Sequence, residues 1–339
     1  MYYDESMPHE VKLTPKENYF RVVDGLEPEY MPAFFTNGQV FWDEDFLTPM
    51  LAPEPVKTKL GVTYVGTKEL NYGAMPQPNV VIIDDITKWR DQFSIEDFSD
   101  FDFESYYHSK VSHIDRESHF VVSGGADYFL TLVSLLGFEN TLLSLFEEPE
   151  ATKELLDYIH GYYMFIYKKQ LEYVKPEMLS TMDDICSQQQ PFFSLDMYRE
   201  FFKPLEKEHY DLALDRGMRI AHHCCGHCEM FLDDWIEMGV QVWNPAQVFN
   251  DLVGIKAKYG HCLTIEGAWD EVGFSLCDDE EELREGVRTY VDTFAPGGRF
   301  DYLAVCSGNA ELDPKVKWRN DICMDMYRTY AFDWYKNQG

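Results

Sequence analysis

Side chains able to bind a metal ion or act as nucleophiles gather in one short segment, where His222, His223, Cys224 and Cys225 follow one another directly. The residues before them, 218–221, are Met-Arg-Ile-Ala and indicate a buried strand. Successive side chains of a strand point to opposite faces, so His223 and Cys225 share one face while His222 and Cys224 share the other. The second face continues the apolar positions of the strand, and we expect it to pack beneath helices.

A further sulfur ligand is offered by Cys306, which follows the apolar run 300–305. On a buried parallel sheet, His223 and Cys225 are expected to point inward, and Cys306 would join them from another strand end. One imidazole and two thiolates suit zinc, and three protein ligands with an open fourth position are typical of a catalytic zinc site. The sequence therefore predicts a metal site made by His223, Cys225 and Cys306.

Three other polar residues stand where predicted strands end. Glu266 alternates with apolar neighbours, so we expect its carboxylate to point inward. It could be a fourth zinc ligand, a proton carrier, or a carboxylate hydrogen-bonded to a neighbour away from the metal. Asp184 is expected to bind substrate or support a ligand, and with Glu266 it forms the candidate catalytic pair. Asn244 precedes a proline and is expected to hold a loop or donate to substrate.

Composition excludes several classes of function. The chain carries 60 acidic and 29 basic residues, a net charge of -31, and no basic stripe, which argues against direct binding of nucleic acid. No apolar run approaches the roughly 18 residues of a membrane-spanning helix. No basic segment followed by an apolar run marks a signal peptide, so the eight cysteines are expected to be reduced thiols or ligands in the cytoplasm.

The elements that must position these residues alternate between strands and helices. Thr14, Pro15 and Glu17 have the spacing of a capping box within a helical lead-in, residues 1–30. Residues 36–78 are predicted to be irregular. Strands are predicted at 31–35, 80–83, 119–123, 178–184, 218–224, 240–243, 262–265 and 300–305, and helices at 150–175, 195–216, 228–238, 279–294 and from Pro314 toward Tyr335.

Buried strands separated by helices predict a parallel sheet of the α/β class. At least seven strands favour a closed (β/α)8 barrel over an open sheet, in one domain covering 1–339. No Gly-x-Gly-x-x-Gly follows an early strand, which weakens a dinucleotide-binding alternative. In such barrels the chemistry lies at the carboxyl ends of the strands, where the sequence places Asp184, His223, Cys225, Asn244, Glu266 and Cys306.

Several segments occur in the order of a known family. They are 13–18, 27–32, Asp183-Asp184, 201–204, His223 to Gly226, and 239–247. Together they resemble the uroporphyrinogen decarboxylase superfamily, and within it the zinc- and corrinoid-dependent methyltransferases. The specific part is His-x-Cys-Gly with a late cysteine on the last strand, which is the zinc signature of the methyltransferase branch. The resemblance implies a (β/α)8 TIM barrel with an N-terminal helical extension and zinc inside its mouth.

This resemblance implies transfer of a methyl group from a small-molecule donor to the cob(I)amide of a separate corrinoid protein, because the chain has no evident corrinoid domain. Zinc can stabilise a developing oxyanion as a Lewis acid. Phe34, Trp42 and Tyr302 are expected to bind the substrate, and aromatic walls favour an aromatic methyl ether, hence O-demethylation. The same zinc could instead activate a thiol as the methyl acceptor, so the direction of transfer stays open.

Other interpretations compete with this one. The decarboxylases of the family meet their polyanionic substrate with arginines after the first strand, whereas residues 34–42 contain no Arg or Lys. Cys225 to Cys228 spells the Cys-Gly-His-Cys motif of thiol-disulfide redox proteins, although Cys224 replaces the usual Trp. His222, His227 and Cys228 could form a structural zinc knuckle, although no second cluster accompanies them. A non-catalytic protein that binds metal or corrinoid is also compatible with the scaffold.

Overall fold

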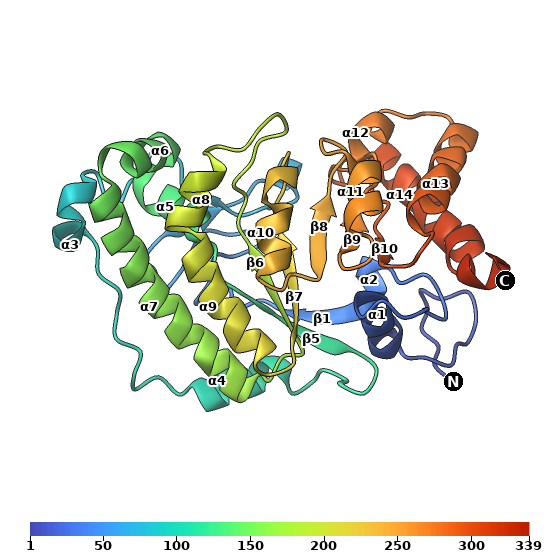
Figure 1. Ribbon diagram of the computed structural model, residues 1–339, viewed down its shortest axis with the longest axis horizontal. Helices are drawn as coiled ribbons and strands as arrows, with labels where there is room; N and C mark the ends of the chain where they lie inside the picture. The colour runs from blue at the N-terminus through green and yellow to red at the C-terminus, as the bar shows by residue number, and fades with distance from the viewer. Residues whose placement is uncertain (339) are drawn as a thin grey trace. The chain divides into compact units, whose positions relative to one another are not determined.

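The computed structural model describes residues 1–338, without the side chains of residue 35 and residues 37–40. The chain divides into two compact units. The first comprises Met1–Gln39, Ile114–Phe120 and Val240–Gly339, and the second comprises Val40–His113 and Val121–Gly239. Both contain parallel strands connected through helices (Figure 1), so the α/β class predicted from the sequence is confirmed.

Three neighbouring parallel strands of the second unit carry the candidate site. They are β5 (Phe120–Gly124), β6 (Met178–Met182) and β7 (Arg219–His223). β6 pairs with β7 over five registered positions, from Met178 opposite Arg219 to Met182 opposite His223. Because parallel strands end at the same edge of a sheet, the loops after β6 and β7 meet there. The strands predicted at 119–123, 178–184 and 218–224 are confirmed, and their ends differ from the prediction by one or two residues.

The helices of the second unit differ from the prediction at one break. α7 (Pro149–Tyr173) is confirmed, and it lies beside α9 (Lys203–Leu214) in Figure 1. The single helix predicted over 195–216 is two helices, α8 (Leu195–Phe201) and α9, because Pro204 has no N–H for a continuous helical ladder. The remaining helices here are α3 (Trp89–Gln92), α4 (Phe103–Val111), α5 (Tyr128–Leu136), α6 (Phe138–Glu147) and α10 (Leu232–Glu237), with 3-10 turns at Lys68–Leu70, Ile86–Lys88 and Glu229–Phe231.

Two predictions for the early part of the second unit are wrong. Residues 36–78 are not wholly irregular, since they contain a small antiparallel sheet of β2 (Val56–Lys57), β3 (Thr63–Val65) and β4 (Met75–Pro76). Residues 80–83 do not form a strand, because the N–H groups of Ile82 and Ile83 both donate to the Leu135 carbonyl of α5. Their apolar character misled the prediction, since half of the run is solvent-exposed.

The first unit holds a second group of parallel strands, β8 (Val242–Ala246), β9 (Thr264–Gly267) and β10 (Phe300–Tyr302), with β9 paired to both others. The capping box that the sequence predicts is present: Thr14 accepts from the Glu17 N–H, and α1 spans Pro15–Val23. The strand predicted over 31–35 is reduced to one parallel bridge, between Ala33 and Tyr302, because the chain turns into α2 (Phe34–Asn37) before β1 (Gly38–Phe41).

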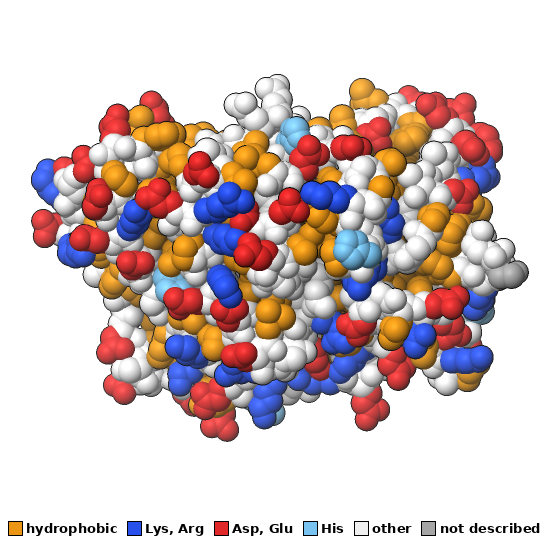
Figure 2. Space-filling view, in the orientation of Figure 1, with side chains coloured by type: hydrophobic (Ala, Val, Ile, Leu, Met, Phe, Trp, Pro, Cys, Tyr) orange, Lys and Arg blue, Asp and Glu red, His pale blue; other side chains and the backbone are white. Residues whose placement is uncertain are grey.

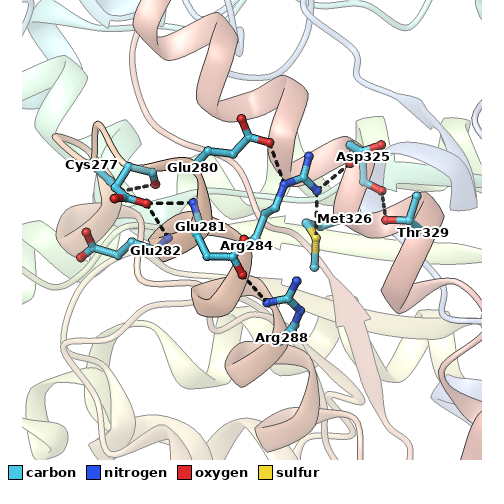
Figure 3. Close-up of polar contacts among 10 residues, drawn as sticks. Cys277, Glu280, Glu281, Glu282, Arg284, Arg288, Asp325, Met326 and Thr329 are labelled. Atoms are coloured by element: carbon cyan, nitrogen blue, oxygen red, sulfur yellow. Dashed lines mark hydrogen bonds and ion pairs between the residues drawn. The ribbon is translucent and has the colours of Figure 1, made fainter.

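Helices at the end of the chain are fixed by caps and ion pairs. They are α11 (Leu252–Tyr259), α12 (Glu271–Phe274), α13 (Glu280–Phe294) and α14 (Pro314–Met326), followed by a π-helical turn at Tyr327–Ala331 and a 3-10 turn at Tyr335–Gln338. The Asp279 side chain accepts hydrogen bonds from two N–H groups at the start of α13. Arg284 of α13 forms ion pairs with Glu280 of the same helix and with Asp325 of α14 (Figure 3). The helix predicted at 279–294 is confirmed, with Asp279 as its N-cap.

The visible surface carries acidic and basic side chains interspersed with apolar ones (Figure 2). Within residues 1–338, no single helix has the length and apolarity needed to cross a membrane; α5 and α6 reach those values only when taken together, as a pair bent by 108°.

Candidate metal site

The two faces of β7 are occupied as strand alternation requires. His222 is fully buried, its Nδ1 lies 2.7 Å from the Tyr210 hydroxyl and 3.0 Å from the Thr181 hydroxyl, and its ring packs on Trp235 at 4.0 Å between centroids. Burial lowers the pKa of His222 to about 3, so this imidazole is neutral and belongs to the core under the helices. The opposite face carries the partly exposed His223.

His223, Cys225 and Asp184 bring three ligand atoms together. The His223 Nε2 lies 3.6 Å from the Cys225 Sγ and 3.8 Å from an Asp184 carboxylate oxygen. One ligand atom from each residue lies within 4.8 Å of the other two, and this is the only group of its kind among residues 1–338. The structure thus unites two predicted ligands with a residue that the sequence placed beside the metal.

These distances can be compared with those of a zinc complex. Tetrahedral zinc with bonds of about 2.3 Å to sulfur and about 2.0 Å to nitrogen separates the two ligand atoms by about 3.5 Å. The His223 Nε2 and the Cys225 Sγ lie 3.6 Å apart, close to this value. Nitrogen, sulfur and carboxylate oxygen are all ligand types that zinc accepts. The donor set therefore fits a zinc ion without rearrangement of His223 and Cys225.

Main-chain hydrogen bonds hold the loops that carry these ligands. The Cys225 N–H donates to the Asp184 carboxylate at 2.7 Å, and the Asp183 N–H donates to the His223 carbonyl at 3.1 Å. The buried Asp183 carboxylate accepts from the first N–H groups of α5, at Phe129 and Leu130. Asp183 therefore fixes the end of β6 to the N-terminus of α5, and Asp184 is presented toward β7.

Gly226 permits the close approach of the two loops. Its φ of +94° lies in the left-handed region, and a Cβ built on it would lie 2.5 Å from the Ser187 carbonyl oxygen. That carbonyl accepts the His227 N–H at 2.8 Å. The glycine of the His-x-Cys-Gly motif is thus required by the packing of the β7 loop on the β6 loop.

Cys306 lies in the first unit, whereas His223 and Cys225 lie in the second. It is buried, and its N–H donates to the Asn320 side chain of α14 at 2.7 Å. The hydrogen bond from the Cys323 thiol lowers the pKa of the Cys306 thiol. Its part as a zinc ligand stays a prediction. Asn320 was not recognised from the sequence, since an amide in a helix carries no signal for holding a distant loop.

Glu266 belongs to a buried pair of carboxyl groups in the first unit. It lies opposite Asp301 in the register of β9 and β10, and both side chains are almost inaccessible. Burial raises the pKa of Glu266 well above its ordinary value, the neighbouring Asp301 raises it further, and a hydrogen bond with Tyr19 opposes the shift. Burial beside Asp301 thus favours the neutral form of the Glu266 carboxyl. Asp301 was missed because its place within an apolar strand suggested no chemistry.

The remaining predicted site residues have different surroundings. Trp42 lies in the second unit, donates to the Thr48 carbonyl at 2.6 Å and packs against Gly124, at which a Cβ would lie 2.6 Å from the indole. In the first unit, Phe34 is about half exposed, Asn244 is partly buried in β8, and Tyr302 is fully buried with its hydroxyl donating to the Cys323 carbonyl at 2.7 Å. Their roles toward substrate stay predictions.

Comparison with known proteins places these features in a family. A family model described as uroporphyrinogen decarboxylase (URO-D) matches residues 121–302, more than half of the chain. A solved structure of a methyltransferase from Methanosarcina mazei is similar at a TM-score of 0.63 and 13% sequence identity, covering 94% of this chain and 98% of that one. No curated protein matches the sequence. The likeness to the solved structure concerns the fold, and it agrees with the predicted barrel.

Proposed function

Because the chain belongs to the uroporphyrinogen decarboxylase family, we propose that it is a zinc-dependent methyltransferase that moves a methyl group from a small-molecule donor to the cob(I)amide of a separate corrinoid protein. The observation that carries this proposal is the grouping of Asp184, His223 and Cys225 at the ends of β6 and β7. A similar fold in a protein named a methyltransferase supports the same reaction class.

His223 and Cys225 would hold the zinc, with Asp184 as an oxygen ligand and Cys306 as the further thiolate expected from the sequence. When bound, zinc supplies a Lewis acid that stabilises a developing oxyanion or thiolate. The protein's own contribution is positional. The Asp184 carboxylate accepts the Cys225 N–H and so fixes the direction of the thiolate. Hydrogen bonds that orient a metal ligand typically change metal affinity by about 10–100-fold.

The site disfavours decarboxylation of a polyanion. Residues 34–42 contain no Arg or Lys that could bind substrate carboxylates. The last residue of this segment, Trp42, packs its apolar indole on the Gly124 backbone. An aromatic donor is favoured over a carboxylate-rich one by such surfaces. We therefore propose an aromatic methyl ether as the donor, with Phe34, Trp42 and Tyr302 on the substrate side and Glu266 as a proton carrier.

A zinc and turnover assay tests the proposal. The purified protein is expected to hold about one zinc ion per chain, and Cys225→Ser is expected to weaken zinc binding about 100-fold, since each of four ligands contributes about 3 kcal/mol. Cys262→Ser, a partly buried thiol in the first unit, is the matched control and should keep its zinc. Equal zinc content in both variants would remove the basis of the proposal.

Turnover separates the competing reactions. The cob(I)amide absorbance of an added corrinoid protein should disappear on addition of aromatic methyl ethers, with the free phenol as product. Methylation of an added thiol by a methylated corrinoid protein would assign the opposite direction of transfer. Zinc bound without turnover of any donor, in either direction, would identify a non-catalytic binding protein.

A further inference from the structure

The segment that follows β10 in the first unit is bound by one side chain of α14. The Cys306 N–H donates to the Asn320 side-chain oxygen at 2.7 Å, and the Asn320 side-chain nitrogen donates to the Cys306 carbonyl at 3.3 Å. One amide therefore pairs with both main-chain groups of the same residue. Two bonds of this kind fix both the position and the orientation of the Cys306 backbone, whereas a single bond would leave it free to turn.

The same helix contacts this segment at two further points. The Tyr302 hydroxyl, at the end of β10, donates to the Cys323 carbonyl at 2.7 Å. Val316 precedes Asn320 by four residues, so the two side chains share one face of α14. Gly308 has a φ of +122°, and a Cβ built on it would lie 2.9 Å from a Val316 methyl carbon. Residues 302–308 therefore lie against α14, with Asn320 as the polar contact between two packed ends.

A second helix binds the residue that follows Cys306. The Glu271 carboxylate of α12 accepts the Ser307 hydroxyl at 2.7 Å, and its other oxygen accepts the Gln247 side-chain amide at 3.4 Å. Gln247 follows β8, Glu271 follows β9 and Ser307 follows β10. One carboxylate thus joins the loops after three neighbouring parallel strands. The Cys306–Ser307 segment is therefore bound by side chains of two different helices.

We propose that Asn320 is a positioning residue for the Cys306 thiol and that Glu271 supports it. This inference rests on the proposed function, in which Cys306 supplies a thiolate to zinc. Neither residue takes part in coordination. They hold the Cys306 backbone in place before an ion binds, so that binding does not have to order the segment as well.

Burial ranks the two contributions. Cys306 is only 3% exposed, whereas Ser307 is exposed to solvent. Water competes less well for a hydrogen bond in a buried place, so the bonds from Asn320 should hold the segment more firmly than the bond from Ser307 to Glu271. Removal of the Asn320 amide should accordingly have the larger effect, and removal of the Glu271 carboxylate a smaller one in the same direction.

Hydrogen–deuterium exchange of the chelator-treated full chain tests the positioning without any metal. In peptic peptides that cover residues 303–308, the Cys306 amide should exchange at least about fivefold faster in Asn320→Ala, the ratio expected for one lost hydrogen bond. Asn320→Asp keeps an oxygen that accepts the Cys306 N–H and should restore most of the protection. Asp321→Ala is the matched control, because Asp321 is the next residue of α14, is exposed and pairs with Lys317 of the same helix.

Metal binding then tests the consequence for the site. In competition with a chromogenic chelator, Asn320→Ala should bind zinc at least about tenfold more weakly, and Asn320→Asp should lie closer to the unmodified chain. With cobalt in place of zinc, the charge-transfer absorption from thiolate sulfur should weaken in Asn320→Ala at equal cobalt occupancy. A purely structural role would lower stability and leave that absorption unchanged. Glu271→Ala should show the same changes at smaller size.

Cys306→Ser separates this inference from the proposed function. If Cys306→Ser binds zinc as tightly as the unmodified chain, the thiolate assignment fails, and the positioning role toward zinc fails with it. If Cys306→Ser loses affinity and Asn320→Ala does not, the assignment stands and the positioning role is overturned. Unchanged exchange of the Cys306 amide in Asn320→Ala also overturns it. Circular dichroism checks folding, and Asn320→Gln replaces Asn320→Ala if the alanine variant does not fold, because its longer side chain moves the amide away from Cys306.

Discussion

Replacing Gly226 by alanine probes how the metal site is held. The residue has a φ of +94°, and the added Cβ would lie 2.5 Å from the Ser187 carbonyl oxygen and 2.9 Å from its carbon. These are backbone atoms, so no side-chain rotation can relieve the contact. The loop after β6 must move away from the loop after β7, and the hydrogen bond from the His227 N–H to Ser187 is lost.

Gly217→Ala is the matched control for this change. Gly217 has a φ of +69°, lies in the same unit, and an added Cβ meets no atom within 4 Å. This variant should lose only about 1–2 kcal/mol of unfolding free energy, the strain of a left-handed alanine. Gly226→Ala adds to that strain a lost hydrogen bond, worth about 1 kcal/mol, and the displacement of packed backbone, worth about 1 kcal/mol or more. We expect a total of about 3–4 kcal/mol.

Urea unfolding of the chelator-treated proteins, followed by tryptophan fluorescence, measures both variants, and competition with a chromogenic chelator measures zinc affinity. Gly226→Ala should unfold at lower urea than Gly217→Ala and bind zinc at least about tenfold more weakly, since Cys225 directly precedes the altered residue. Equal urea midpoints for the two variants, or unchanged zinc affinity in Gly226→Ala, would refute the view that backbone contact between the loops shapes the site.

Three other predictions follow from the second unit. His222→Ala should lower the unfolding free energy by about 2–4 kcal/mol, whereas His223→Ala should abolish tight zinc binding with little change in the urea midpoint; the reverse pattern would mean that the faces of β7 were misassigned. Burial raises the pKa of Glu206 to about 7 from 4.5, so the folded protein retains this proton while the unfolded chain releases it, and stability falls as pH rises from 4.5 to 7. Glu206→Gln should reduce that loss by about 3 kcal/mol, measured as unfolding free energy at pH 5 and pH 8, and an unaltered pH dependence would contradict the assignment. Asp183→Ala leaves one buried and one partly buried N–H group of α5 unpaired and should lower stability by about 3 kcal/mol in a melting or urea experiment. A stability like that of the unmodified protein would show that those groups find other partners.

Sequence patterns were sufficient where a rule acts within a few residues. The capping box at Thr14 and the strand alternation at β7 depend only on local geometry, and both agree with the structure. The break between α8 and α9 could also have been predicted, because Pro204 stands inside the expected helix. The error at 80–83 has another origin. An apolar run becomes a strand only when a neighbouring strand accepts its hydrogen bonds, and here α5 supplies the acceptor.

Long-range pairings were out of reach for the same reason. Asp184 could be placed beside the metal because it ends a predicted strand, but its approach to His223 depends on the register between β6 and β7. One sequence carries no record of register between strands, so this contact could not be derived from spacing.

The origin of the ligand geometry determines how the site should respond to mutation. Main-chain hydrogen bonds fix the loop that carries His223 and Cys225. The Asp183 N–H donates to the His223 carbonyl, and the Cys225 N–H donates to the Asp184 carboxylate. Loss of a ligand should therefore change metal affinity and spare the fold. Loss of Asp183 or Gly226 should change both, since these residues hold the loops and take no part in coordination. A site assembled by the metal itself would behave differently, because removal of any ligand would then lower stability as much as removal of a loop contact.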